Sequence, residues 1–310
     1  MRMKYRLHCS TLRRVPARSP GLLHVAALHC ATPRGVAQHP RSGAQQPRGL
    51  RGRSHSAFTL VELLVVIGIL LPTLSAARKQ AYTTRCMSNL RQLLTASIAY
   101  QQENHGFWPP AHLNYTYPAT GQNLNRWHGQ RATMSKPFDF TGSVLKRYLQ
   151  TPEIKLCPAF EPAKAGFEAA CGGYGYNERF IGSSLEEPSL AYITDPQQYN
   201  QDVSNRPAKQ NMIRRPAEKI AFADTAMATP SLIEYSFAEP PTFTSMGTLA
   251  TSSPSLHFRH NKRANIGWAD GHVSSEMFEW THPTNAYGAN NAKFLLGFFG
   301  PRDNTLFQRN

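Results

Sequence analysis

The feature that most constrains this chain is a single apolar run at residues 58–71, FTLVELLVVIGILL. Eleven of its fourteen residues are strongly apolar, and the exceptions are Thr59, Glu62 and Gly68. Continued to Ala77, the run has twenty residues before Arg78 and would form a helix of roughly 30 Å, just enough to cross a bilayer core. The fourteen residues alone would reach only about 21 Å, which is typical of a signal peptide. The segment therefore predicts either a membrane helix or a secretory signal cleaved after Ser75-Ala76-Ala77.

Glu62 argues against the secretory signal. A carboxylate in an apolar helix costs about 2.5–3.5 kcal/mol on membrane-insertion scales, and such a residue normally marks a function and a partner. We therefore expect a cationic group to neutralise Glu62 inside the membrane.

Residues 1–57 differ sharply from the rest of the chain. They hold eleven Lys and Arg residues and no acid, whereas the remainder holds 23 basic and 19 acidic residues, so the leader accounts for +11 of the total charge of +15. Without a sustained apolar period, this basic leader is predicted to be disordered, and translation starting after Met1 is an alternative. Since the charge lies in the leader, no nucleic-acid partner is expected once it is removed.

The sequence around the apolar run, Ala57-Phe58-Thr-Leu-Val-Glu62, resembles the processing and methylation signature of type IV pilins and type II secretion pseudopilins. The resemblance implies that prepilin peptidase cleaves between Ala57 and Phe58 and that the new amine of Phe58 is methylated. It also implies that Glu62 is required for assembly. Pairing of the Phe58 amine of one subunit with Glu62 of the next would fix the register between helices. Such a head-to-tail contact propagates as a filament.

Two positions depart from the signature, and both concern the membrane segment. Ala57 stands where the family usually has Gly, and Pro72 ends the apolar run about seven residues sooner than is usual. The resemblance nevertheless places the chain in a bacterial inner membrane as a single-pass protein. Its globular domain would be periplasmic, and its partners would be prepilin peptidase, the membrane and other pilin or pseudopilin subunits.

The segment 78–106 continues the apolar run as an amphipathic helix. Apolar and small residues recur there at three-to-four spacing, which predicts one face packed on a sheet. Asn104 and Gly106 give the stop signal. Joined to residues 58–77, the segment predicts one helix from residue 58 to about 103, bent at Pro72.

Residues 107–310 read as a domain of short strands and turns. A short helix is expected at 143–149, and irregular excursions are expected at 182–212 and 225–253. The whole chain is therefore predicted to be α+β and pilin-like, with a long kinked N-terminal helix packed on a C-terminal antiparallel sheet that carries loop insertions. The expected strands lie at 154–158, 174–177, 219–223, 255–260, 264–269 and 272–278.

The last two strands are joined by Asp270-Gly271, a two-residue hairpin signal in which both positions would need positive φ. His260, nine residues and then Asp270-Gly271 is similar to the H-X9-DG signature of a bacterial family of prepilin-type, processing-associated proteins. Segments upstream match the same family in order along most of residues 58–280.

The signature region raises a metal hypothesis. His260, Asp270 and His272, with His257 and Asp224 nearby in the pattern, could converge at one end of a sheet. We favour the structural interpretation, in which Asp270-Gly271 is a turn and His260 bonds a neighbouring strand, so no cofactor is expected. No nucleophile elbow, phosphate loop, His-Glu-x-x-His or Cys-x-x-Cys motif occurs, and the chain is not predicted to be an enzyme.

Three cysteines follow the predicted cleavage site: Cys86, Cys157 and Cys171. On the oxidising side of a membrane one pair could bridge. Cys157 and Cys171 are nearest in sequence, whereas the resemblance favours Cys86 with Cys157.

Three functions compete at this point. The first is a pilin- or pseudopilin-like structural subunit of a type II secretion or type IV pilus-like assembly. The second is a membrane-tethered or secreted binding module, in which the H-X9-DG region is the active surface and no filament forms. The third is a metal-dependent enzyme using His260, Asp270 and His272.

Overall fold

The protein is described here from a computed structural model. It divides into two units, Met1–Ala57 and Phe58–Asn310. The structure describes residues 59–113, 124–149, 151–162, 165–186, 206–245 and 248–310. The predicted basic leader, Ala57 and Phe58 therefore lie outside the described residues.

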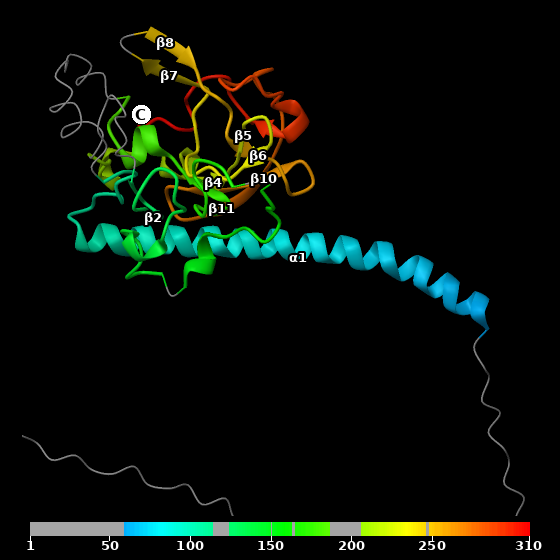
Figure 1. The fold of residues 1–310 in the computed structure, drawn as a ribbon. Helices are drawn as coiled ribbons and strands as arrows, with labels where there is room; N and C mark the ends of the chain where they lie inside the picture. The colour runs from blue at the N-terminus through cyan, green and yellow to red at the C-terminus, as the bar shows by residue number, and fades with distance from the viewer. Residues whose placement is uncertain (1–58, 114–123, 150, 163–164, 187–205, 246–247) are drawn as a thin grey trace, which may run out of the picture. The chain divides into compact units, whose positions relative to one another are not determined.

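One helix dominates the N-terminal part of the described chain. Helix α1 spans Leu60–Glu103 without a break, so the prediction of a single long helix is confirmed. Its 44 residues correspond to roughly 66 Å. Pro72 lies inside it and removes one backbone donor, and the helix curves in its N-terminal part (Figure 1). It ends at Asn104, whose backbone N–H bonds the carbonyls of Tyr100 and Gln101.

The C-terminal part is built around a four-stranded antiparallel sheet with the order β11-β10-β4-β3. The sequence therefore predicted an α+β layout correctly, with these four strands close to their expected places. The sheet consists of β3 (Tyr174–Tyr176), β4 (Ile220–Asp224), β10 (Arg263–Trp268) and β11 (Val273–Met277).

The sheet is covered on both faces, which explains why β4 and most of β10 are buried. The second half of α1 packs on one face through Leu90, Leu93 and Leu94, which meet Phe222 of β4 in one apolar cluster. The other face carries a second cluster, to which the C-terminal segment contributes Phe298. Burying a leucine of this size contributes about 1.5–3 kcal/mol.

Gly267 of β10 lets the helix approach the sheet closely. A Cβ atom at this position would lie 3.0 Å from Cδ1 of Leu94. The register of β10 against β4 also shifts between Gly267 and Trp268, which is a bulge. A small residue is therefore required where α1 crosses the centre of the sheet.

The remaining strands form four two-stranded antiparallel pairs outside the main sheet. They are β1 (Asn125–Arg126) with β2 (Gly129–Gln130), β5 (Met227–Ala228) with β6 (Leu232–Ile233), β7 (Thr242–Ser245) with β8 (Thr248–Thr251), and β9 (Leu256–His257) with β12 (Leu296–Gly297). Short helical turns lie at Phe140–Gly142, Pro152–Lys155, Glu178–Gly182, Gln210–Met212, Pro216–Glu218 and Ala292–Phe294.

Several local predictions were wrong. Residues 143–149 form turns instead of a helix, because so short a segment cannot repay helix nucleation. The expected strand at 154–158 begins within the 3-10 helix Pro152–Lys155, where Pro152 suits the first turn. The excursion at 225–253 contains two hairpins, β5-β6 and β7-β8. The predicted loop at 182–212 lies largely outside the described residues.

Candidate functional site

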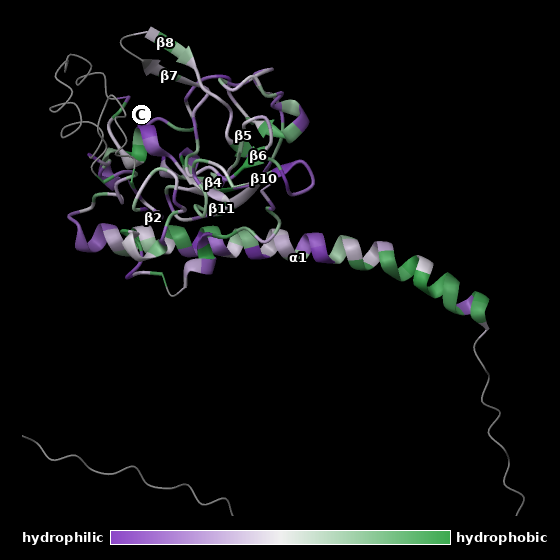
Figure 2. Ribbon diagram, in the orientation of Figure 1, coloured by the Kyte–Doolittle hydropathy of each residue, from purple (hydrophilic) through white to green (hydrophobic). Residues whose placement is uncertain are grey.

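The first half of α1 is an exposed apolar surface. From Leu60 to Tyr82 every residue is exposed, and this half is the most continuously hydrophobic part of the ribbon (Figure 2). The helix is long and apolar enough to cross a membrane. From Cys86 onward, by contrast, the buried residues recur at helical spacing and face the sheet.

Glu62 lies in the first turn of this exposed half, where it completes a capping box with Thr59. The backbone N–H and the hydroxyl of Thr59 both donate to Oε2 of Glu62, at 2.9 and 2.8 Å. The backbone N–H of Glu62 donates to the Thr59 hydroxyl at 3.2 Å. The carboxylate is therefore held at the helix start, bonded to Thr59, the residue that follows Phe58 in the sequence.

The nine residues between His260 and Asp270 consist of strand β10 and the turn residues on either side of it. His260 lies in the turn before β10, and Asp270 lies in the turn after it. The six residues of β10 span roughly 20 Å. His260 is therefore at the opposite end of the strand from Asp270 and His272, so the predicted convergence of these three residues on a metal ion is wrong.

The turns before and after β10 differ in length and in backbone conformation. His260 and Arg263 exchange backbone hydrogen bonds across Asn261 and Lys262, whose φ angles are 53° and 60°. This is the two-residue turn with both central residues at positive φ. The Asp270 turn is a three-residue loop in which only Gly271 has positive φ, at 98°. Asp270-Gly271 therefore lies in the loop of the β10–β11 hairpin, as predicted, but the loop has three residues instead of two. The two-residue turn lies before β10.

Asp270 and His272 stabilise their own turn. The backbone N–H of His272 donates to Oδ1 of Asp270 at 3.0 Å, and the imidazole Nδ1 of His272 lies 2.6 Å from the same oxygen. A Cβ atom on Gly271 would meet Cδ1 of Ile98 on α1 at 3.4 Å. The second part of the signature thus shapes a hairpin end that rests against the helix.

His260 connects the helix, the sheet and the loop before β3. Its Nδ1 lies 3.1 Å from the hydroxyl of Thr83 on α1. Its Nε2 lies 3.3 Å from Oδ2 of Asp224 on β4 and 3.7 Å from the sulfur of Cys157. The side chain is buried, which does not suit an exposed active surface. Burial lowers the pKa of His260, but the bonds to Asp224 and Cys157 outweigh it and raise the pKa to about 9.

Arg259 is the functional neighbour that sequence reasoning missed. Its guanidinium donates to Oδ1 of Asp224 at 2.7 Å, to the carbonyl of Thr225 at 3.1 Å and to the sulfur of Cys157 at 3.2 Å. Both side chains of the Arg259–Asp224 pair are buried. The adjacency of Arg259 to His260 was visible in the sequence, but Asp224 is brought to them only by strand pairing.

The structure brings Cys86 and Cys157 together. Their sulfur atoms are 2.7 Å apart, and Cys86 comes from α1. Cys171 is also buried but bonds only its neighbouring carbonyl among the contacts of the described residues. A disulfide between Cys86 and Cys157, rather than between Cys157 and Cys171, therefore fits this arrangement.

The two sulfurs differ electrostatically. Burial raises the pKa of Cys157, but the hydrogen bond from Cys86, the charge of Arg259 and the bond to His260 lower it to about 5. The shared hydrogen bond and burial raise the pKa of Cys86. In the reduced protein Cys157 is thus the more acidic of the two thiols. A low-pKa thiolate beside a thiol is the arrangement that favours oxidation to a disulfide.

Within the described residues, two buried groups hold three side chains of metal-ligating types. In the group Cys86, Cys157 and His260, the Arg259 guanidinium already bonds the Cys157 sulfur, so a cation would be placed against a fixed positive charge. In the group His128, Glu168 and Cys171, burial raises the pKa of Cys171 well above its ordinary value, and the neutral thiol is a poor ligand.

Comparison with known proteins identifies no family for this chain. No protein-family model, no curated protein and no solved structure matches the chain. Functional inference therefore rests on the two features just described: the exposed apolar half of α1 with Glu62, and the buried cluster that ties its other half to the sheet.

Proposed function

We propose that this chain is a pilin- or pseudopilin-like structural subunit of a type II secretion or type IV pilus-like assembly. Prepilin peptidase removes the leader between Ala57 and Phe58, and the amine of Phe58 is methylated. The first half of α1 then anchors the subunit in the inner membrane and packs against the same segment of neighbouring subunits. The domain formed by the rest of the chain lies in the periplasm.

The observation that carries this proposal is the division of α1. All of its first 23 residues, Leu60–Tyr82, are exposed and most of them are apolar, whereas the following half is packed on the sheet. The part before Arg78, Leu60 to Ala77, has 18 residues and is roughly 27 Å long, close to the thickness of a bilayer core. An apolar helix face of this size is stable only when lipid or protein covers it.

Glu62 provides the second support. In lipid its carboxylate requires a cationic partner, and the amine created by cleavage before Phe58 is such a group. The capping box holds Glu62 at the helix end where that amine would be. A partner on a neighbouring subunit would satisfy the charge and set the axial offset between subunits.

The packed half of the molecule supports the same role in a different way. The contacts of His260, Arg259 and Cys157 fix the sheet to α1. A force applied along the exposed half of the helix is therefore transmitted to the domain. In an oxidising periplasm a disulfide between Cys86 and Cys157 would make this connection covalent.

The decisive experiment is to determine the N-terminus of the membrane-bound protein by mass spectrometry, with the prepilin peptidase present and absent. N-methylated Phe58 supports the proposal. A chain beginning at Arg78 supports simple secretion, and a chain that begins at Phe58 but never enters assemblies supports a tethered binding module.

Two substitutions at Glu62 separate charge from helix capping. Glu62→Ala is expected to leave cleavage intact and to abolish incorporation into cross-linked assemblies. Glu62→Gln retains a side chain that fits a capping box but removes the charge. Because the proposal depends on charge, the Gln variant should fail as completely as the Ala variant; normal incorporation of either would contradict the pairing.

A further inference from the structure

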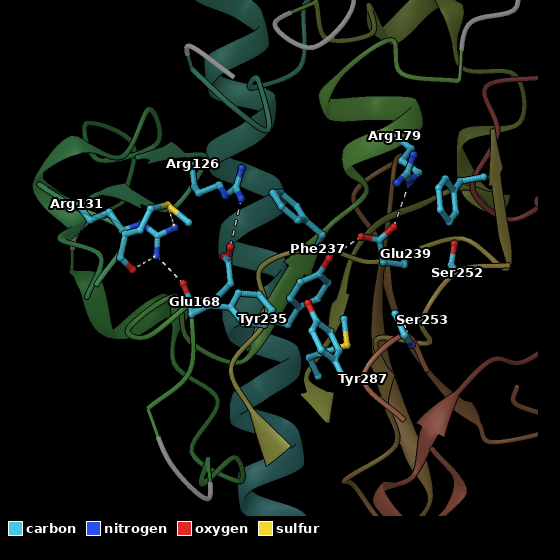
Figure 3. Close-up of a pocket in the computed structure, with 15 residues that line it drawn as sticks. Arg126, Arg131, Glu168, Arg179, Tyr235, Phe237, Glu239, Ser252, Ser253 and Tyr287 are labelled. Carbon is cyan, nitrogen blue, oxygen red and sulfur yellow. Dashed lines mark hydrogen bonds and ion pairs between the residues drawn. The ribbon is translucent and has the colours of Figure 1, made fainter. Parts of the chain in front are cut away.

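A cavity of about 310 Å³ lies in the domain, away from Glu62 and from the His260 cluster. Its volume is near the lower end of the range of small-molecule sites, roughly 300–1,000 Å³. Figure 3 shows Arg126 and Glu168 on one side of it and Arg179 and Glu239 on the other. The cavity therefore presents two charged pairs that face a common space.

Each of these arginines faces a carboxylate, and Arg179 also bonds Glu186. A third arginine, Arg131, lines the cavity and donates to backbone carbonyls. Nη2 of Arg126 lies 3.2 Å from Oε1 of Glu168, and Nε of Arg179 lies 3.2 Å from Oε2 of Glu239. Both carboxylates are buried. A hydroxyl group can accept from a guanidinium and donate to a carboxylate, so it can bond both members of either pair.

The charged pairs are held in place by aromatic rings. The guanidinium of Arg126 lies over the ring of Phe237 at 4.7 Å, and that of Arg179 lies over the ring of Phe243 at 4.3 Å. The hydroxyl of Tyr235 donates to Oε1 of Glu239 at 2.7 Å. The polar groups are thus oriented before any ligand arrives, which reduces the entropy lost on binding.

Aromatic rings also form the rim of the cavity. The side chain of Phe167 is 37% exposed and that of Tyr287 is 54% exposed. Their ring centroids are 6.0 Å apart with an interplanar angle of 35°, and Phe167 also meets Tyr235 edge-on at 6.3 Å. Exposed rings beside a polar cavity provide a flat apolar surface for one face of a ligand.

Ser252 gives an independent sign that a ligand is missing. It lines the cavity, is 4% exposed, and its hydroxyl has no hydrogen-bond partner within the described residues. Buried hydroxyls are nearly always bonded, so an unpaired one on a cavity wall calls for a polar group inside the cavity.

We propose that this cavity binds an uncharged sugar residue of a glycan. A sugar ring offers hydroxyls around its edge for the two ion pairs and for Ser252, and an apolar C–H face for Phe167 and Tyr287. An aliphatic ligand would offer no hydrogen bonds to this polar lining, and an acidic ligand would compete with Glu168 and Glu239 for their arginines. The site lies on the domain and does not depend on filament formation.

The test is isothermal titration of the full chain in a detergent without a sugar headgroup, such as lauryldimethylamine oxide. The probes are N,N′-diacetylchitobiose, cellobiose, maltose and glucuronic acid. Saturable binding of at least one of the three neutral disaccharides, tighter than that of glucuronic acid, is expected.

Variants connect the binding to the cavity. Tyr287→Ala should weaken binding about tenfold, because it removes an exposed stacking surface without opening the core. Ser252→Ala should weaken it about three- to tenfold through loss of one hydrogen bond. Tyr82→Ala, which removes a tyrosine of 38% exposure on α1, is the matched control and should bind as the unmodified chain does.

Three results would overturn the inference: no saturable binding of any neutral probe, preferential binding of glucuronic acid, or unchanged affinity in both the Tyr287 and Ser252 variants. None of these results bears on cleavage at Phe58 or on assembly, so the two proposals fail independently.

Discussion

The two halves of α1 have the same backbone but different environments. Leu64 in the first half is 58% exposed, whereas Leu93 in the second half is completely buried against the sheet. Both are leucines in one uninterrupted helix. The comparison teaches that helix formation is a local property, while the partner of each helix face is decided by what the rest of the chain places beside it.

The two halves differ most in the hydrogen-bond partners of their polar side chains. In the first half, Glu62 has only Thr59 as a hydrogen-bond partner among the described residues. In the second half, Thr83 and Cys86 join a cluster that includes His260, Asp224 and Arg259. The packed half therefore contributes to the stability of the domain, and the exposed half remains available for contacts outside it.

The largest expected effect tests this division directly. Leu93→Ala should lower the free energy of unfolding by about 2–5 kcal/mol, because it leaves a cavity against the sheet. Leu64→Ala is the matched control and should change the unfolding free energy by less than about 0.5 kcal/mol. Denaturant titration of both variants in detergent checks the comparison; similar losses in both would show that the first half also packs within the chain.

The second-largest expected effect comes from a disulfide between Cys86 and Cys157. Oxidised protein should show one bridge, between Cys86 and Cys157, and should lose about 2–4 kcal/mol of stability on reduction. Peptide mapping after alkylation identifies the bridge. Cys171→Ser is the control, because removing that sulfur should leave the redox difference unchanged; a bridge that includes Cys171 would contradict the geometry.

The smallest expected effect is a pH dependence of the folding stability, caused by His128 in the packed part of the chain. His128 is completely buried, and burial together with the charges of Lys155, Arg126 and Arg131 holds its pKa well below the ordinary value. Below pH about 6.5 the unfolded chain takes up a proton that the folded chain resists. Stability should therefore fall on acidification, by up to about 1.4 kcal/mol per pH unit for this group.

His128→Asn should flatten this slope between pH 6.5 and 5, whereas the exposed His105→Asn should leave it unchanged. His260 does not oppose the trend. Its raised pKa, about 9, means that its stabilising contribution is fully present below pH 6.5 and is lost only as the pH rises through 9. Chemical denaturation at several pH values measures the slopes, and equal slopes in both variants would exclude His128 as the cause.

Much of the fold could be predicted from local patterns. The apolar run and the three-to-four spacing from Cys86 onward indicated one helix, and the alternation and turn residues indicated β3, β4, β10 and β11. Errors occurred where local signals were short. The turns at 143–149 resemble a helix in composition, and Asp270-Gly271 resembles a two-residue turn, although the turn with two positive φ angles is at Asn261 and Lys262.

The candidate sites also differ in how far local sequence could predict them. The sequence by itself determined the exposed helix with Glu62, because hydrophobic length and an isolated carboxylate are properties of consecutive residues. Only the tertiary structure decided that Asp224, Arg259, His260 and the two cysteines form one cluster. It likewise decided that the cavity between Arg126 and Arg179 is polar and rimmed by rings. These residues are far apart along the chain, and only the pairing of strands and the packing of α1 bring them within hydrogen-bonding distance.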